Sequence, residues 1–480
     1  MQFNSVAYIF GFLPFVVAGW ALLRRTRYAN PFIACVSLYF YGSSRVWYLA
    51  PLFFTALLDY YIGQKVYESK DPLRRRNLTA FSVVANLGLL SYFKYGHWLT
   101  AKFAPALAGV GLALPVISVG LPPAISFYTF QSMSYTIDIY RREFKPYRSV
   151  IDYLSFVTFF PHLVAGPIMR ARDLLPQLAR GRSLPSAEQV SMALFMILFG
   201  LFQKIVVADN MAAVVDEISA DLSKPGIPVA PGLGLIFAYA FAIQIYCDFA
   251  AYSTIARWSA KLLNVELMRN FATPYFSTGP SEFWQRWHIS LSTWLRDYLY
   301  IPLGGNRGST ARSYRNLMLT MVIGGLWHGA GILFIVWGFW HGCLLVAYRL
   351  VPIDRALARF GALEKVIAAA LFFQLVCVGW IFFRAAPAQI PAIFHSIAAV
   401  PPVLLAPAEN KQFLGYVWLM SLMWAPMLVF DYFGWRRGGE FPDVFPSFNT
   451  ALKVLVSLLL IYAIVFFGRR QASEFIYFAF

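Results

Sequence analysis

The chain has 480 residues, of which 59% are hydrophobic and only 13% are charged, and its formal net charge is +17. Soluble proteins carry about a quarter charged residues and roughly half apolar ones, so this composition excludes an ordinary soluble protein. The positive charge does not indicate nucleic-acid binding, because the basic residues form short clusters between apolar runs, as in loops held on the cytoplasmic side of a membrane. These clusters are Arg24–Arg27, Arg74–Arg76, Arg141–Arg142, Arg180–Arg182, Arg436–Arg437 and Arg469–Arg470.

The first apolar run covers residues 6–23 and ends at Arg24. No charged residue precedes this run and no small-residue cleavage site follows it, which favours a first transmembrane helix over a removed signal peptide. Because the positive residues that stop the run belong on the cytoplasmic side, we expect the N-terminus to be extracytoplasmic.

Further apolar runs recur along the whole chain. A helix needs about 20 mostly apolar residues to cross a bilayer, and it satisfies its own backbone groups in lipid. We therefore predict an all-α polytopic membrane protein with about 11 transmembrane helices and additional short interfacial or re-entrant helices. The polar interludes are as short as ordinary loops, so residues 1–480 are predicted to form a single transmembrane domain. The runs lie near residues 6–23, 31–41, 46–66, 78–99, 104–118, 121–140, 150–167, 188–208, 232–256, 316–350, 364–383, 412–433 and 450–468.

Asp248 lies in the middle of the apolar run 233–255. An ionisable residue at membrane depth is by default a functional-site hypothesis. Its carboxylate can orient a histidine or pair with an arginine such as Arg257 or Arg286, and a structural ion pair is the favoured interpretation. Asp59, Lys94 and Asp138 are further ionisable residues inside apolar runs.

Residues 281–300 carry too many ionic groups for a membrane span. Pro280 suits the first turn of a helix, and helical spacing gives the segment an apolar stripe. We predict an amphipathic helix that lies at the membrane interface or is inserted into the protein. Anchoring to lipid headgroups is the plain alternative, but an anchor does not need His288 or Asp297. The stripe consists of Trp284, Trp287, Leu291, Trp294, Leu295 and Tyr298, whereas Glu282, Arg286, Thr293 and Arg296 cluster elsewhere.

The apolar run 316–350 follows a predicted glycine-permitted turn at residues 301–308. This run is too long for one straight span, and a glycine cluster at Gly324–Gly331 interrupts it. A helix broken at membrane depth has to line a cavity or be buried in protein. His328 sits in the predicted break and is the foremost candidate functional residue. The structural alternative is a neutral histidine that bonds a backbone carbonyl between helices.

The remaining histidines and the cysteines point less clearly to chemistry. Structural roles explain His341 and His162 better, and neither pairs with another ligand at metal-binding spacing, so we predict no metal. The sequence lacks a phosphate-binding glycine loop and a nucleophile elbow. If the protein is an enzyme, a histidine therefore acts as a base. Buried, unreactive thiols are expected at Cys35, Cys247, Cys343 and Cys377.

Five motifs resemble those of the membrane-bound O-acyltransferase superfamily, and more narrowly its bacterial branch with alginate O-acetyltransferases and teichoic-acid D-alanyltransferases. The resemblance runs over nearly the whole chain and shows no departure at the histidine motifs. The last two motifs are similar to the alginate-acetylation side of the branch. The motifs are WQRWHISLSTWLRDY at residues 284–298, PLGG at 302–305, GLWHGA at 325–330, FFPHLVAGPI at 159–168 and FIYFAF at 475–480.

The resemblance implies a ring of tilted helices around a thin central region, with a funnel on each side. It implies that His328 is the catalytic histidine, and that His288 is the second histidine, on the cytoplasmic-facing side of a tunnel. Members of the superfamily pass an acyl group from a cytoplasmic thioester to a hydroxyl on the far side of the membrane. The expected location is the inner membrane of a bacterium.

The resulting hypothesis is an O-acyltransferase in which neutral His328 takes the proton of an acceptor hydroxyl that attacks the thioester. His288 is expected to assist at the donor, and Arg286 and Arg296 are expected to attract the phosphates of coenzyme A or an acidic carrier protein. No permanently bound cofactor is expected, because acetyl-coenzyme A or an acylated carrier protein acts as a substrate. The expected acceptor is an exopolysaccharide such as alginate, or an exported partner protein that passes the acyl group on.

Two alternatives stay open. D-alanyl transfer from a carrier protein to teichoic acid fits the same residues, and the resemblance alone favours acetyl. A transporter or lipid flippase would explain the hydrophobicity and the broken helix, but not a Trp-His-Gly motif after an interfacial helix. The sequence also lacks the internal repeats that many transporters show.

Overall fold

A computed structural model of the chain describes residues 1–109, 112–113, 115–179, 183–224, 229–351, 362–400, 410–437, 449–469 and 473–478. The regular secondary structure of this described part is helical, which confirms the predicted all-α class. The chain divides into two compact units. The first comprises Met1–Leu194 and Ser253–Met268, and the second comprises Phe195–Tyr252 and Arg269–Ala479. The prediction of a single domain over residues 1–480 stays a prediction.

Long α-helices dominate both units, with short π and 3₁₀ segments, labelled η, between them. In the first unit these are η1 (Ala7–Phe12), α1 (Leu13–Leu23), α2 (Ala29–Gly42), η2 (Val46–Tyr48), α3 (Leu49–Glu68), α4 (Pro72–Ala108), α5 (Ile125–Tyr140), α6 (Val150–Thr158), α7 (Phe160–Leu163) and α8 (Ala171–Ala179). Two helices contribute to both units, namely α9 (Ala187–Phe202) and α11 (Leu233–Leu262). In the second unit are η3 (Gln203–Ala208), α10 (Asp209–Leu222), η4 (Pro274–Phe276), α12 (Pro280–Arg286), α13 (Ile289–Leu295), η5 (Arg296–Tyr300), α14 (Thr310–His328), α15 (Ile332–Leu350), α17 (Ala362–Arg384), η6 (Pro387–Gln389), α18 (Ile390–Ala398), α20 (Lys411–Arg436), α21 (Thr450–Phe467) and η10 (Ile476–Phe478).

Seven helical stretches among the described residues are long and apolar enough to cross a membrane. The predicted class of polytopic membrane protein is therefore confirmed, while the count of about 11 spans stays a prediction. The predicted first span forms an apolar helix over Ala7–Leu23, which is shorter than these seven. The seven stretches are Val46–Glu68, Ala187–Leu222, Leu233–Leu262, Ile332–Leu350, Lys365–Arg384, Lys411–Arg436 and Thr450–Phe467.

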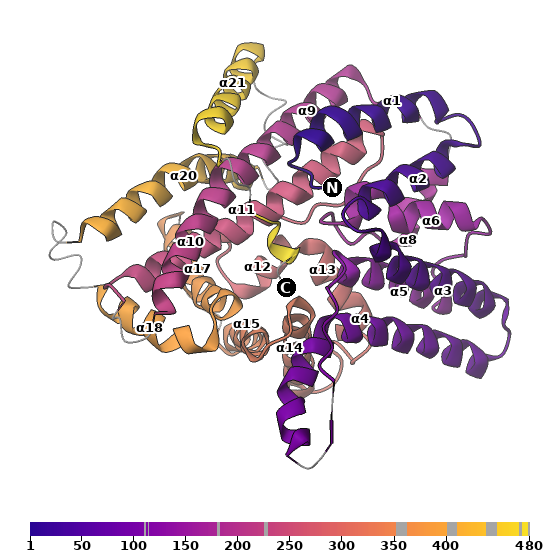
Figure 1. Cartoon of the computed structure of the whole chain (residues 1–480), viewed down its shortest axis with the longest axis horizontal. Helices are drawn as coiled ribbons and strands as arrows, with labels where there is room; N and C mark the ends of the chain where they lie inside the picture. The colour runs from indigo at the N-terminus through magenta and orange to yellow at the C-terminus, as the bar shows by residue number, and fades with distance from the viewer. Residues whose placement is uncertain are drawn as a thin grey trace. The chain divides into compact units, whose positions relative to one another are not determined.

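The long apolar run 316–350 is broken where its glycines predict a break. Helix α14 ends at His328 and α15 begins at Ile332, and the two helices pack against each other (Figure 1). Glycines permit a very close approach of their backbones. A methyl group on Gly325 would lie 2.2 Å from the carbonyl oxygen of Phe334, and one on Gly338 would lie 2.3 Å from that of Met321. The pair α14 and α15 is therefore held rigidly at the residue that the sequence marks for chemistry.

We expect Gly338→Ala to lower stability by about 1–3 kcal/mol, because the added methyl group overpacks this backbone contact. Gly415→Ala in α20 is the matched control, since a methyl group there meets nothing within 4 Å. That control should gain about 0.5–1 kcal/mol from the better helix propensity of alanine. Thermal unfolding of the two purified variants measures both effects, and equal melting temperatures would contradict the proposed role of Gly338.

The predicted amphipathic helix over residues 281–300 is only partly correct. Helix α12 does begin at Pro280, and Trp287 and Leu291 from the predicted stripe are buried. However, the helix is interrupted at His288, which adopts the left-handed region at φ 41° and separates α12 from α13. The interruption arises because the backbone around His288 bonds to residues 270–272 instead of continuing the helix. Ala272 N–H donates to the carbonyl of Arg286, and Ile289 N–H donates to that of Asn270.

A buried carboxylate organises the core of the first unit. Asp59 on α3 accepts hydrogen bonds from Ser82 Oγ, from Asn86 Nδ2 at 2.8 Å and from Thr136 Oγ1 at 2.8 Å. These neutral donors come from α4 and α5, so the carboxylate joins three helices. These contacts indicate that Asp59 has a structural role in the first unit.

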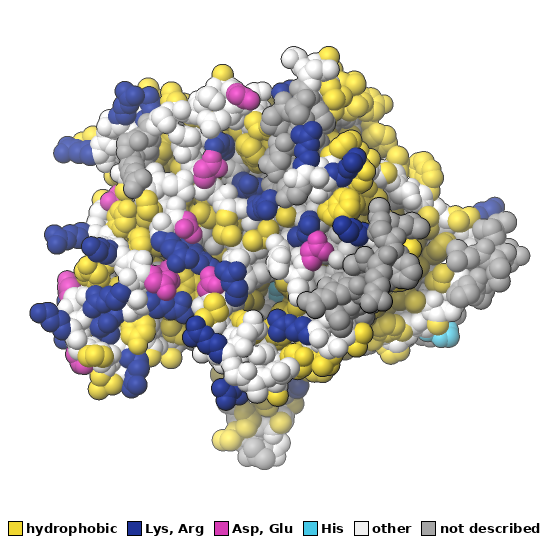
Figure 2. Space-filling view, turned by 180° about the vertical axis from the view of Figure 1, so that it is seen from behind, with side chains coloured by type: hydrophobic (Ala, Val, Ile, Leu, Met, Phe, Trp, Pro, Cys, Tyr) yellow, Lys and Arg dark blue, Asp and Glu magenta, His cyan; other side chains and the backbone are white. Residues whose placement is uncertain are grey.

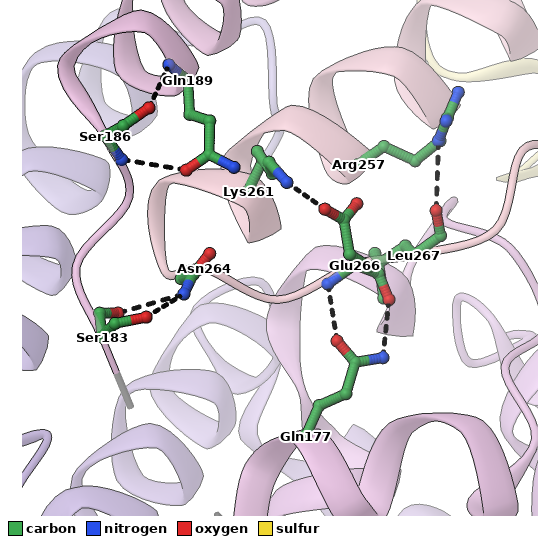
Figure 3. Close-up of polar contacts among 9 residues, drawn as sticks. All are labelled: Gln177, Ser183, Ser186, Gln189, Arg257, Lys261, Asn264, Glu266 and Leu267. Atoms are coloured by element: carbon green, nitrogen blue, oxygen red, sulfur yellow. Dashed lines mark hydrogen bonds and ion pairs between the residues drawn. The ribbon is translucent and has the colours of Figure 1, made fainter. Parts of the chain in front are cut away.

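The loop after α11 is fixed to α8 by polar contacts within the first unit (Figure 3). Gln177 exchanges two hydrogen bonds with the backbone of Glu266, at 2.8 and 3.0 Å. Lys261 pairs with Glu266, and Arg257 Nε donates to the carbonyl oxygen of Leu267 at 3.3 Å. Arg257 was one of the two arginines suggested as partners of Asp248, and this contact gives it another role.

Lys and Arg side chains occur at many places on the face of the molecule shown in Figure 2, with fewer Asp and Glu side chains among them. The basic cluster Arg180–Arg182 and the second residue of the cluster Arg469–Arg470 lie outside the described residues. Of the four cysteines, Cys247 and Cys377 are buried as expected, whereas Cys343 is only half-buried and Cys35 is exposed, so the predicted burial of these two is wrong.

Candidate active site

A cavity of about 220 Å³ lies in the second unit and is lined by α12, α13, η5, α14 and α15. Its apolar wall includes Leu317, Met321 and Leu345, which pack together with Trp284 and Tyr300. Its polar lining comes from hydroxyl, amide, imidazole and guanidinium side chains. The lining residues are Ser281, Trp284, Gln285, Leu291, Ser292, Leu295, Arg296, Tyr300, Leu317, Thr320, Met321, Gly324, His328, Trp337 and Leu345.

His328, the last residue of α14, is part of the cavity lining. Its side chain is 3% exposed and is surrounded by aromatic rings. The ring centroids of Trp327 and Trp337 both lie 4.9 Å from that of the imidazole, and those of Phe383 and Tyr477 lie 5.2 and 5.7 Å away. The predicted break therefore places one imidazole against a cavity and holds its ring in a rigid aromatic frame.

His288 is fully buried in the interruption between α12 and α13. Asn270 supports it from the neighbouring segment, because its side-chain oxygen accepts hydrogen bonds from Ser290 Oγ at 2.6 Å and from Ser290 N–H at 3.3 Å. The ring of Phe249 packs edge-on against the imidazole, with 4.6 Å between the centroids. Burial lowers the pKa of His288 to about 3, so this imidazole is neutral at physiological pH.

The structure brings the two predicted catalytic histidines into one aromatic cluster. Trp327 and Tyr477 each contact both imidazoles. The centroid of Tyr477 lies 5.7 Å from that of His328 and 6.2 Å from that of His288. His288 is absent from the lining of the cavity, so the two histidines face different surroundings.

Tyr477 is a site residue that reasoning from the sequence missed. The terminal motif of residues 475–480 was recognised only as a family resemblance, and its last two residues lie outside the described part of the chain. Nothing in the local sequence shows that η10 reaches the two histidines. The available signal was composition, because a run of aromatic residues after the last apolar helix is unusual for an exposed tail. Burial raises the pKa of Tyr477, so its hydroxyl stays protonated and can donate a hydrogen bond.

A buried ionic cluster holds the segment that carries Tyr477. Lys204 Nζ lies 2.8 Å from Asp209 Oδ1 and 2.8 Å from Asp248 Oδ1, and it donates to the carbonyl oxygen of Ser473 at 3.0 Å. Asp248 Oδ2 in turn accepts from the N–H of Ile476 at 2.7 Å. The predicted ion pair of Asp248 is therefore confirmed, but its partner is Lys204, and the arginine partners suggested from the sequence are wrong.

The two arginines proposed for the donor differ in their surroundings. Arg286 Nη2 pairs with Glu282 at 2.9 Å, and Nη1 donates to Thr273 Oγ1 at 3.1 Å and to the carbonyl oxygen of Ala272 at 3.2 Å. These contacts hold the backbone next to His288. Arg296 instead lines the cavity, with a side chain that is 58% exposed and paired with Asp297.

Two further histidines that the sequence singled out, His341 and His162, are buried in different places. His341 on α15 stacks on Phe283 with an interplanar angle of 6° and contacts Trp284 and Trp337. In the first unit, Nε2 of His162 lies 2.8 Å from the carbonyl oxygen of Phe156. This contact agrees with the structural role expected for His162.

No group of three His, Cys, Asp or Glu side chains in the described ranges is arranged to hold a metal ion. The absence of a metal and of a resident cofactor stays a prediction.

The helices and the cavity define a multi-pass membrane protein in which two buried histidines share an aromatic cluster next to a cavity. Over residues 33–352 the sequence matches the membrane-bound O-acyltransferase family. The chain belongs to this family, and it is an acyltransferase.

Three relatives illustrate the range of this similarity. The chain is 40% identical to a "Probable alginate O-acetylase" of Pseudomonas syringae pv. tomato, over 80% of this chain and 72% of that protein. It is 33% identical to a peptidoglycan O-acetyltransferase of Helicobacter pylori, over 80% of this chain and 77% of that protein. It is 28% identical to a teichoic acid D-alanyltransferase of Streptococcus thermophilus, over 53% and 66% of the two chains.

Proposed function

We propose that this protein transfers an acetyl group from a cytoplasmic thioester to a hydroxyl group of an extracytoplasmic polysaccharide or of an exported partner protein. The observation that carries the proposal is the cavity that reaches His328, whose ring shares its aromatic surroundings with His288. A buried imidazole against a cavity large enough for a small acyl group provides a base where two substrates can meet.

His328 acts as the general base in the proposed reaction. The hydroxyl oxygen of the acceptor attacks the thioester carbonyl carbon, a C–O bond forms and the C–S bond breaks. The hydroxyl proton passes to the imidazole of His328 and from there to the departing thiolate, which leaves as a thiol. Proton transfer of this kind contributes about 10²–10⁴-fold to the rate, and holding the two substrates in place supplies much of the remainder.

Arg296 serves the donor in this proposal, and His288 and Arg286 support the site indirectly. His288 is neutral and lies outside the cavity lining, so it acts through Trp327 and Tyr477, whose rings contact both imidazoles. Arg296 at the cavity is the better placed of the two arginines to attract the phosphates of coenzyme A or an acidic carrier protein, because the contacts of Arg286 hold local backbone. The thioester is a substrate, and no resident cofactor takes part.

Acetyl is favoured over D-alanyl as the transferred group. The two relatives with identities of 33% and 40% are described as O-acetylating enzymes, and the D-alanyltransferase is less similar. We further propose that the protein resides in the inner membrane of a bacterium with its N-terminus outside the cytoplasm, since the cluster Arg24–Arg27 follows the first apolar helix.

The protein reconstituted in liposomes tests this function directly. We expect acetyl label from acetyl-coenzyme A or an acetylated carrier protein to enter alginate entrapped inside, with one thiol released for each acetyl group transferred. Label transfer from a D-alanylated carrier protein alone would favour teichoic-acid chemistry. Solute flux without thioester cleavage would instead favour a transporter and contradict the proposal.

A further inference from the structure

The lining of the cavity carries no negative charge. All of its residues belong to the described part of the chain, and none of them is an aspartate or a glutamate. The permanently charged side chain among them is Arg296, which is a cation. Towards His328 the lining is apolar, because it is formed by Trp337 on α15, Met321 on α14 and Leu295 on α13. Such a cavity suits a neutral ligand, since a buried cation would lose its hydration without a counter-charge.

Gly324 borders the place where the transferred acyl group has to lie. It precedes His328 by four residues on α14, and both residues line the cavity. Side chains four residues apart on a helix are neighbours, at about 5–6 Å. When the acyl carbon is within reach of a hydroxyl group that His328 deprotonates, the acyl chain therefore lies beside position 324. The side chain at this position determines how much room the acyl chain has.

Packing does not require a glycine at position 324. A methyl group there would meet only Cδ1 of Leu295, at 3.3 Å, whereas one on the neighbouring Gly325 would lie 2.2 Å from the carbonyl oxygen of Phe334. Leu295 itself lines the cavity, so its side chain can turn aside. Glycine inside a helix is also less stable than alanine. The missing side chain of Gly324 is therefore explained by the room that it leaves in the cavity.

The space beside Gly324 differs from the space beside other unobstructed glycines. A methyl group on Gly11, Gly88 or Gly415 would meet nothing within 4 Å, but these three residues are exposed. Gly324 is buried, so the space beside it lies inside the protein. One water molecule needs about 10–15 Å³ of such a space. The cavity of about 220 Å³ therefore has room for a thioester whose acyl chain is longer than acetyl.

We propose that the cavity selects neutral short-chain acyl groups, and that Gly324 is the specificity-determining residue that admits chains longer than acetyl, such as isobutyryl. The inference rests on the proposed acyl transfer and defines its donor class. The reaction is unchanged: the acceptor oxygen bonds to the acyl carbon, the C–S bond breaks, and His328 passes the hydroxyl proton to the thiolate. A D-alanyl group is rejected, because its amino group is largely protonated near neutral pH and would enter an apolar site without a counter-charge.

Isobutyryl and D-alanyl thioesters are the matched pair that tests selection by charge, because one methyl group of isobutyryl is an ammonium group in D-alanyl. Each acyl group, with acetyl as the reference, is loaded on coenzyme A and on a carrier protein. Transfer to entrapped alginate is then measured with the protein in liposomes. We expect kcat/KM for isobutyryl to lie within about tenfold of that for acetyl, and that for D-alanyl to be at least about 10²-fold below isobutyryl. Equal values for isobutyryl and D-alanyl, or transfer of acetyl alone, would overturn the proposal.

Gly324→Ala tests the role of this residue in selection by size. The added methyl group takes the space of one acyl methyl group, so kcat/KM for isobutyryl should fall by about 10–200-fold relative to that for acetyl. This ratio of two donors does not depend on the amount of folded protein, so a merely structural effect leaves it unchanged. Gly415→Ala is the matched control and should keep the wild-type ratio, because its methyl group meets nothing.

The outcomes separate this inference from the proposed function. Acetyl transfer with the wild-type ratio in Gly324→Ala would overturn the role of Gly324 and leave acyl transfer intact. If the unmodified protein transfers no acyl group from either thioester carrier, the proposed function itself fails, and the selection fails with it.

Discussion

His328→Ala is expected to reduce the rate of acyl transfer by about 10²–10⁴-fold, the contribution of a general base. The imidazole lines the cavity at the end of α14, and alanine leaves no group there that can accept the proton of the acceptor hydroxyl. Transfer of labelled acetyl by the purified protein in liposomes measures the effect. His328→Gln should be as inactive, because glutamine keeps much of the side-chain volume but is not a base.

His162→Ala separates loss of chemistry from loss of packing. His162 is also a buried histidine, and its ring bonds a backbone carbonyl in the first unit. We expect this control to melt at lower temperature and to keep its transfer rate per folded molecule. A His328→Gln protein that still transfers acetyl at the wild-type rate would remove His328 from the mechanism. If the His162 and His328 variants lost activity only in proportion to their folded fraction, a structural role would explain both.

The sequence predicted the position of His328 because its determinants are local. A run of apolar residues longer than one span has to break somewhere, and glycines between Gly324 and Gly331 fix where. One of these glycines, Gly325, also permits the close approach to the backbone of Phe334. Pro280 at the start of α12 and the glycine turn after η5, where Gly304 and Gly305 have positive φ, were predicted for the same reason.

Contacts between distant segments could not be predicted in this way. The interruption at His288 depends on the segment around Asn270, whose backbone accepts the hydrogen bond that a continuous helix would have made internally. The contact of Tyr477 with both histidines joins chain positions far apart in the sequence. The buried ion pair of Lys204 could have been predicted from the sequence. Lys204 is a charged residue inside the apolar run 188–208, and such a residue needs a counter-charge at membrane depth.

This lysine is the basis of the second large effect that we expect. Lys204→Met should destabilise the protein by about 3–5 kcal/mol, the usual cost of removing one partner from a buried ionic group. The side chains of Lys204, Asp209 and Asp248 are at most 2% exposed, so without the ammonium group two carboxylates face each other in a region that water does not reach. Thermal or denaturant unfolding in detergent measures the loss.

Asp248→Asn is the matched variant on the other side of the cluster, and its effect should be much smaller. Lys204 keeps Asp209 as its counter-ion, so the remaining pair is neutral, and the asparagine oxygen can still accept from the N–H of Ile476. The two variants also differ in what they do to the site. Lys204 holds the carbonyl of Ser473 directly, so its loss should release the segment that places Tyr477 beside the histidines.

Hydrogen exchange of the peptide that contains residues 473–478 reports this release. Faster exchange and slower acetyl transfer are expected in Lys204→Met, and near-native values of both in Asp248→Asn. Because opposite charges that are buried together attract strongly, the order of the two variants depends on net charge rather than on the number of hydrogen bonds lost. Equal destabilisation by the two substitutions would show that the cluster acts through its hydrogen bonds alone. Amides at 473–478 that stay protected from exchange in Lys204→Met would show instead that aromatic packing on Phe249 and Tyr252 holds the terminal segment.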